Sequence, residues 1–255
     1  MREIHALIRN GKLKEALEYC AEKLKDDPLN FDIRSAYTEL LCVNGELEKA
    51  DKQLDFMVTK SPEFAVGAVN LRHLIRAEQA RQDFYAGKAA PKLFHDANEL
   101  DEAFLEMHIN LLANDIDKAT EIAAQVEQLR TNTVEDQQAA IRDLDDSINP
   151  YLEILGTNGE FYLARFDEIE KLEFEPVDSI VEQIWLRAEV IIKNGPSGTA
   201  HIPLVYPYSE TELEKLGQVT EWQELSENLI QGKGMKMFYA NDEAILISDL
   251  GRFIA

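Results

Sequence analysis

Two histidines near the middle of the chain have the residue types and spacing that could bind a metal ion. His95 and Glu99 are four residues apart, and His108 follows after Glu102 and Glu106. Imidazole and carboxylate groups one helical turn apart can ligate zinc. No residue in the sequence fixes a third ligand, so the pattern favours a charged helix face. We therefore predict no metal ion and no cofactor.

Two other patterns resemble catalytic motifs only in part. The segment 232–234, Gly-Lys-Gly, lacks the Walker spacing and the terminal Lys-Ser/Thr, and it is expected to precede a strand. The carboxylate pairs Asp145/Asp146 and Glu168/Glu170 have no recognisable partner base or metal. The sequence therefore predicts no catalytic residue.

A repeat organises the first half of the chain. The segment 11–16 returns as 45–50, and Pro28 returns as Pro62, each 34 residues later. This period is typical of tetratricopeptide repeats, in which helix pairs stack side by side. Residues 114–119 are a loose third copy of the turn. We expect helices from residue 2 to about Gly87, and a surface that holds another chain.

The pattern changes after Asn149-Pro150. A capped helix is predicted from Thr133 to about Asp146, followed by strands. The expected division is a tetratricopeptide-like helical domain at 1–147 and a small, mainly β (α+β) domain at 148–255. Strands are predicted at 151–155, 161–163, 185–192, 201–206, 234–240 and 244–247, with a short helix at 176–184.

Charge is distributed unevenly along the chain. The net charge is −22, yet residues 1–92 contain 15 basic and 15 acidic side chains, so residues 93–255 carry all of it. Nucleic-acid and anionic-membrane binding need clustered positive charge, so both are disfavoured. No apolar run reaches the roughly 18 residues of a membrane span. Cys20 and Cys42 lie in helical patterns and are expected to be reduced core residues of a cytosolic protein.

An ordered series of short segments in the second half resembles the ImpE/TagJ family, accessory proteins of bacterial type VI secretion. No single motif is specific, but the order is. The series comprises Asp143-Leu144-Asp145-Asp146, Leu152-Glu153, Gly159-Glu160-Phe161-Tyr162, Trp185 with Ala188, Ile202-Pro203-Leu204, Tyr206-Pro207, Leu216-Gly217, Thr220 with Trp222, Gly232 with Gly234, and Asp242-Glu243.

The resemblance implies a non-enzymatic cytoplasmic adaptor. Its expected partners are a helix near the N-terminus of the contractile sheath small subunit and the ClpV-type AAA+ unfoldase that recycles the sheath. Six residues are candidates for the partner-binding surface: Tyr37, Leu41, Arg72, Trp185, Tyr206 and Trp222.

Two alternatives remain open at the level of sequence. One is a small-molecule or metal-dependent enzyme with a site between the two domains, indicated by His95, Glu99 and His108. The other is a generic helical scaffold for an unrelated partner. The oligomeric state is not predicted.

Overall fold

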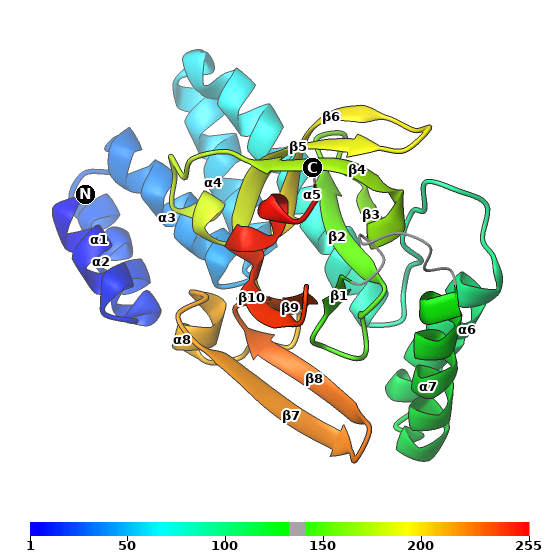
Figure 1. The fold of residues 1–255 in the computed structure, drawn as a ribbon. Helices are drawn as coiled ribbons and strands as arrows, with labels where there is room; N and C mark the ends of the chain where they lie inside the picture. The colour runs from blue at the N-terminus through cyan, green and yellow to red at the C-terminus, as the bar shows by residue number, and fades with distance from the viewer. Residues whose placement is uncertain (133–140, 255) are drawn as a thin grey trace.

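The computed structural model describes residues 1–132 and 141–254, with helices first and strands second (Figure 1). This confirms the predicted fold class, a helical repeat half followed by a mainly β half. The helices are α1 (Arg2–Arg9), α2 (Leu13–Asp26), α3 (Phe31–Val43), α4 (Leu47–Lys60), α5 (Ala65–Tyr85), α6 (Glu99–Leu112), α7 (Ile116–Asn132) and α8 (Glu212–Lys215). Short 3₁₀ helices are η1 (Pro62–Phe64), η3 (Phe166–Glu168), η4 (Val181–Gln183) and η5 (Ile247–Arg252).

The two repeats form the helix pairs α1–α2 and α3–α4. Gly11 and Gly45 follow the first helix of each pair with φ of +72° and +81°. Glycine adopts this left-handed conformation without the steric cost that other residues meet. Ala16 and Ala50 are 0 % exposed, as small residues at a close contact between helices must be. The predicted repeat is therefore present.

Ala50→Leu is expected to lower the free energy of unfolding by about 1–3 kcal/mol, because the larger side chain has no room at this buried contact. Thermal or urea unfolding measures the change. Ala124 on α7 is exposed, so Ala124→Leu is a matched control with an expected change within about 0.5 kcal/mol. Equal stability of Ala50→Leu and the parent would contradict the packing of the repeat.

The helical array stops at α5. The third glycine of a 34-residue period would stand at Gln79, but that residue lies inside α5, which continues to Tyr85. The third copy of the turn, at 114–119, instead connects α6 to α7. These helices pack near the carboxyl end of α5, where the His108 ring stacks on Phe84 at 4.3 Å between centroids. Among the described helices, no further pair makes extensive contact with the first half of α5.

The second half contains three antiparallel sheets. The largest has the strand order β3-β2-β6-β5-β4, the next β1-β9-β10, and the smallest is the hairpin β7-β8. The strands are β1 (Arg142–Asp143), β2 (Tyr151–Gly156), β3 (Phe161–Arg165), β4 (Ile169–Phe174), β5 (Trp185–Ile192), β6 (Ser197–Pro203), β7 (Thr220–Ser226), β8 (Leu229–Gly234), β9 (Met237–Ala240) and β10 (Glu243–Leu246).

Most predicted strands are confirmed, with some corrections. The strands β2, β3 and β5 match the predictions at 151–155, 161–163 and 185–192. The strand predicted at 201–206 begins and ends earlier, as β6, and the helix predicted at 176–184 is only the single turn η4. The strands β4, β7 and β8 were not predicted, and the strand predicted at 234–240 begins only at Met237, as β9.

The mainly β half also begins earlier than predicted. The prediction of a helix from Thr133 to about Asp146 is wrong for Arg142 and Asp143. These two residues form β1, which pairs with β9. The first part of that prediction, 133–140, lies outside the described residues. The division at 147/148 into two domains stays a prediction.

Short polar side chains explain why residues 143–147 do not form a helix. The Asp143 carboxylate accepts from the amide of Asp145 at 2.9 Å, and the Asp145 carboxylate accepts from the amide of Ser147 at 2.8 Å. Such bonds to the backbone two residues ahead compete with helical hydrogen bonds and favour turns.

A single cluster of buried apolar side chains joins the helices to the large sheet. It includes Leu40 of α3, Phe84 of α5 and Tyr151 of β2. Cys20 and Cys42 are buried in the same cluster and are not joined by a disulfide, as predicted. Within residues 1–132 and 141–254, no helix combines the length and the hydropathy that crossing a bilayer requires.

The side of the array formed by the first helix of each pair contacts the second half of the chain. Polar contacts join the end of α1, the end of α3 and the middle of α3 to segments around η4 and α8. They are Gln218 Nε2 to Ile8 O at 2.7 Å, Lys215 Nζ to Asn44 Oδ1 at 3.2 Å, and Ile180 N to Glu39 Oε2 at 2.8 Å. Part of this side is therefore covered by the chain itself.

Candidate functional site

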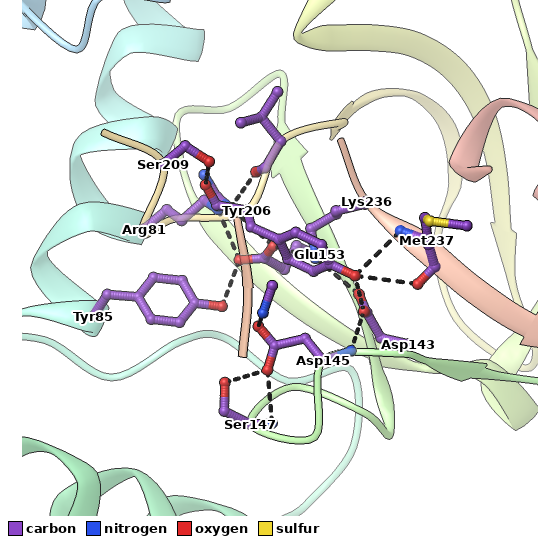
Figure 2. Close-up of polar contacts among 12 residues, drawn as sticks. Arg81, Tyr85, Asp143, Asp145, Ser147, Glu153, Tyr206, Ser209, Lys236 and Met237 are labelled. Atoms are coloured by element: carbon purple, nitrogen blue, oxygen red, sulfur yellow. Dashed lines mark hydrogen bonds and ion pairs between the residues drawn. The ribbon is translucent and has the colours of Figure 1, made fainter. Parts of the chain in front are cut away.

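A buried ionic network joins α5 to the β half (Figure 2). Arg81 lies on the face of α5 that contacts β2, and it is 4 % exposed. Its Nε and one terminal nitrogen donate to the two carboxylate oxygens of Glu153 at 2.7 and 3.0 Å. The same terminal nitrogen also donates to the carbonyl of Val205 at 2.9 Å. This bidentate geometry is the strongest form of a side-chain ion pair.

Glu153 accepts hydrogen bonds from three residues. Besides Arg81, Tyr85 donates its hydroxyl at 2.8 Å and Lys236 lies at 3.0 Å. Burial alone would raise the pKa of Glu153, but the charges of Arg81 and Lys236 outweigh it and lower the pKa to about 2. The carboxylate is thus held ionised with its acceptor positions occupied, which does not suit a general base.

Lys236 extends the network to the last residue of β1, Asp143. Its ammonium lies 2.9 Å from Asp143 Oδ2 and 4.6 Å from the centre of the Tyr206 ring. The Tyr206 hydroxyl donates to Asp143 Oδ1 at 2.6 Å. Burial lowers the pKa of Lys236, but Asp143 and Glu153 outweigh this and leave it raised. Lys236 therefore remains a buried cation shared by two carboxylates.

Asp145 is a further buried carboxylate of the group. It accepts from the amide and hydroxyl of Ser147 at 2.8 and 2.6 Å, and from the amide of Gly232 at 3.0 Å. Burial and the neighbouring Asp143 raise the pKa of Asp145 to about 7. The network therefore fixes α5, β2, β8 and the chain around 143–147 relative to one another.

A cavity of about 310 Å³ lies beside the network, between the α3–α4 turn, α5 and the segment from β6 to α8. Its lining includes Glu78, Trp185, Tyr206 and Lys215. Glu78 is 6 % exposed, and its nearest donor, on Arg81, is 3.3 Å away. Burial raises the pKa of Glu78. Since Arg81 makes its short bonds with Glu153, Glu78 is the weakly paired member of the network.

The six residues predicted for partner binding do not form one surface. Leu41, Trp185 and Tyr206 are buried, and the last two line the cavity just described. Tyr37 and Arg72 are half-buried, and only Trp222 is exposed, at 41 %. Partner binding by any of the six stays a prediction.

Arg72 and Trp222 have contacts within the chain. The Arg72 guanidinium pairs with Asp51 at 2.6 Å and with Asp55. The Trp222 ring meets the edge of Tyr206 at 5.9 Å between centroids. Trp222 thus connects the surface of the β7–β8 hairpin to the buried network.

The histidines singled out from the sequence are not brought together. Helix α6 begins at Glu99, so His95 precedes it and the two do not share a helix face. His95 lies 2.9 Å from Asp101 and 2.5 Å from Glu168 instead. His108 is buried, and burial lowers its pKa. In the part of the chain that the structure describes, no three His, Cys, Asp or Glu side chains are grouped as a metal site.

The Gly-Lys-Gly segment at 232–234 lies within β8 rather than before a strand. Its backbone is paired with β7, with Glu221 opposite Lys233. The amides of a phosphate loop converge on the anion, whereas these belong to a strand of a hairpin. The geometry therefore gives no support to nucleotide binding at this segment.

Known proteins resemble this chain over nearly its full length. The ImpE protein family profile matches residues 135–253. The type VI secretion system accessory component TagJ of Pseudomonas aeruginosa is 24 % identical over 229 residues, which are 85 % of this chain and 79 % of TagJ. A crystal structure of protein VPA1032 from Vibrio parahaemolyticus is 32 % identical and has a TM-score of 0.89, covering 97 % of this chain and 95 % of that one.

Residues 135–253 of this chain belong to the ImpE family. The family match includes the network residues Asp143, Asp145, Glu153 and Lys236, but it does not include Arg81 on α5. Sequence reasoning quoted Asp143, Asp145 and Glu153 for the family resemblance without assigning them a role, and it missed Arg81 and Lys236. The relative TagJ is an accessory component of the type VI secretion system.

Proposed function

We propose that this protein is a non-enzymatic, cytoplasmic adaptor of the type VI secretion system. It binds a helix near the N-terminus of the contractile sheath small subunit and links it to the ClpV-type AAA+ unfoldase. The observation that carries the proposal is the similarity to the accessory component TagJ over 85 % of the chain.

The architecture supports a binding role on physical grounds. Stacked helix pairs present extended surfaces, and an amphipathic helix of a partner can place its apolar face on such a surface. The ionic network and the continuous core fix the β half against α5. An adaptor of this kind presents its two halves in one fixed arrangement, so that each can hold a different partner.

A pull-down tests the proposal directly. The purified chain is immobilised and presented with the two sheath subunits, and then with the ClpV-type unfoldase. The sheath small subunit should be retained, and a version that lacks its N-terminal helix should not be. Failure to retain the small subunit, or equal retention of the shortened version, would contradict the proposal.

Binding of the sheath helix is expected to depend only weakly on salt. Charge interactions between exposed groups are screened over about 8 Å at physiological ionic strength, whereas apolar burial is not. The affinity of a labelled helix peptide should therefore change roughly a few-fold between low salt and about 0.5 M salt, with association slowing more than dissociation accelerates. A fluorescence titration across that range measures it. A loss of about a hundredfold would place the acidic surface at the centre of recognition.

A further inference from the structure

The first half of α5 presents apolar side chains to solvent at the end of the helical array. Val66 is 74 % exposed and Val69 is 49 % exposed. In a repeat array the next helix would cover this face, and the last repeat normally has a polar outer surface. Here α5 runs on past Gln79, where the third turn would stand, and α6 packs near its far end. The valines thus occupy the position where a further helix would stack.

A cavity of about 380 Å³ adjoins these valines. One face of α5, including Gly67 and Asn70, forms one wall, and Val66 and Val69 immediately precede these two residues. The other walls come from α3, η4 and the strands β5 and β6. An exposed apolar stripe therefore borders a pocket large enough for a long side chain.

The polar groups of this cavity favour a cationic occupant. Glu39 contributes a carboxylate from α3, and it accepts from the amides of Ile180 and Val181 at 2.8 and 3.1 Å. Among the described residues, no lysine or arginine is recorded as an ion-pair partner of Glu39. Glu182 contributes a second carboxylate, 3.9 Å from the Arg187 guanidinium.

Arg187 also lines this cavity, but its guanidinium is shared with two carboxylates that do not line it. Its Nε lies closer to Glu175, at 2.9 Å, and its terminal nitrogen is 3.8 Å from Asp178. His201 also lines the cavity, and its buried Nδ1 has no hydrogen-bond partner. Burial lowers the pKa of His201 to about 4, so the ring is neutral at physiological pH. Carboxylates therefore outnumber cations around the cavity.

We propose that this face binds an amphipathic helix of a protein partner. The apolar stripe of that helix covers Val66 and Val69, and one of its Lys or Arg side chains enters the cavity towards Glu39 and Glu182. The inference rests on the proposed function, with the helix of the sheath small subunit as the occupant. It places recognition on α5 at the free end of the array, beside the cavity that α5 forms with α3, η4, β5 and β6.

Gly67 allows binding to be separated from folding. A Cβ atom added at Gly67 would meet no heavy atom within 4 Å. Glycine inside a helix is less stable than residues with higher helix propensity. Gly67→Leu should therefore melt at the same temperature as the parent or higher, while its side chain obstructs the cavity mouth. Loss of binding by this variant cannot then be attributed to unfolding.

The experiment measures the affinity of a labelled peptide that copies the N-terminal helix of the sheath small subunit. Gly67→Leu and Val66→Asp should each weaken binding at least tenfold, whereas Gly67→Ala should stay within about threefold. Ile109 on α6 is also an exposed apolar residue of a helix, at 64 %. Ile109→Asp is thus the matched control and should bind like the parent.

A second arm tests the charge. Glu39→Gln keeps an oxygen that can accept from the two backbone amides but removes the negative charge. It should weaken the peptide several-fold, and replacing one Lys or Arg of the peptide by Met should abolish the difference between Glu39→Gln and the parent. Persistence of that difference with every such peptide would overturn the assignment of a cationic side chain to the cavity.

The two levels of the proposal fail in different ways. If the parent does not bind the peptide, both the proposed function and this site are wrong. If the parent binds but Gly67→Leu and Val66→Asp bind equally well, the site is wrong and the proposed function stands. Equal weakening by Val66→Asp and Ile109→Asp would also overturn the site.

Discussion

Glu153→Gln is expected to lower the free energy of unfolding by about 3–5 kcal/mol. The glutamine has nearly the same size, but it leaves Arg81 and Lys236 with one carboxylate fewer in a region where both cations are less than 5 % exposed. An uncompensated buried charge is among the most destabilising changes that a single substitution can make. Urea unfolding of the parent and the variant measures the difference.

A surface carboxylate of the same half provides the control. Glu173 on β4 pairs with Lys171 at 2.7 Å, and its side chain is 64 % exposed. Exposed pairs of this kind contribute about 0–1 kcal/mol, so Glu173→Gln should be close to neutral. Similar losses for Glu173→Gln and Glu153→Gln would show that the buried network has no special weight in stability.

The parent and Glu153→Gln should differ in how their stability responds to acid. The pKa of Glu153 is lowered to about 2 in the fold, below its ordinary value of 4.5. Its contribution to stability is therefore present above about pH 4.5 and is lost as the pH falls towards 2. The stability gap between the parent and Glu153→Gln should narrow over this range by about 3 kcal/mol. A gap that is constant with pH would contradict the lowered pKa.

Gly234→Ala is expected to destabilise the fold by about 2–5 kcal/mol. Gly234 has φ of +81°, and an added Cβ would lie 2.0 Å from the carbonyl oxygen of Val219. Backbone atoms cannot move aside as the end of a flexible side chain can. The Gly234 amide also donates to Ser209 Oγ at 2.8 Å, and its carbonyl accepts from the amide of Tyr206 at 2.9 Å, so any shift disturbs the network.

The substitution Gly45→Ala is a control for Gly234→Ala. It separates the cost of the left-handed backbone conformation from the cost of the contact between the added Cβ and its neighbours. Gly45 has the same φ of +81°, but an added Cβ would meet only Gln82 Nε2, at 4.0 Å. Gly45→Ala should therefore cost only the left-handed strain, about 1–2 kcal/mol. Thermal unfolding of the two variants should place Gly234→Ala clearly below Gly45→Ala. Equal melting temperatures of the two variants would show that strain, and not space, limits both positions.

The helical half could be predicted because its signals are local. Gly11 and Gly45 mark turns, Ala16 and Ala50 mark close contacts, and all four act within one or two helix lengths. The strand β7 gave no comparable signal, since it is largely exposed and its polar and apolar residues do not alternate. Local patterns therefore identify the repeats but not the hairpin that packs beside α8.

The buried network could not be predicted from the sequence for a different reason. Arg81 stands among other charged residues of α5, where an arginine is normally part of a solvated face. A glutamate in a strand is normally expected to face solvent. Glu153 does not, because the first five residues of β2 are all buried. The pairing becomes visible only when α5, β2 and Lys236 are brought together by the fold.

The cavity beside α5 was missed for a similar reason. Val66 and Val69 fit the apolar pattern of a helix, and such a pattern predicts a packed side. The pattern cannot reveal that the third pair of helices is displaced, which leaves them exposed. For His95 and Glu99 the pattern predicted a contact that does not exist. Their spacing implied a shared helix face, but α6 begins only at Glu99.

The pairing of β1 with β9 has a consequence for how the chain is made. On the ribosome, α1 to α5 emerge early and can stack pair by pair, whereas β1 must wait for a strand near the other end of the sequence. Lys236 also arrives late, so Glu153 and Asp143 lack one of their counter-ions until then. A copy whose translation stops before residue 236 retains charged groups at an unfinished apolar junction. Incomplete copies should therefore be recognised by cellular proteases before they can compete for the partners of the finished protein.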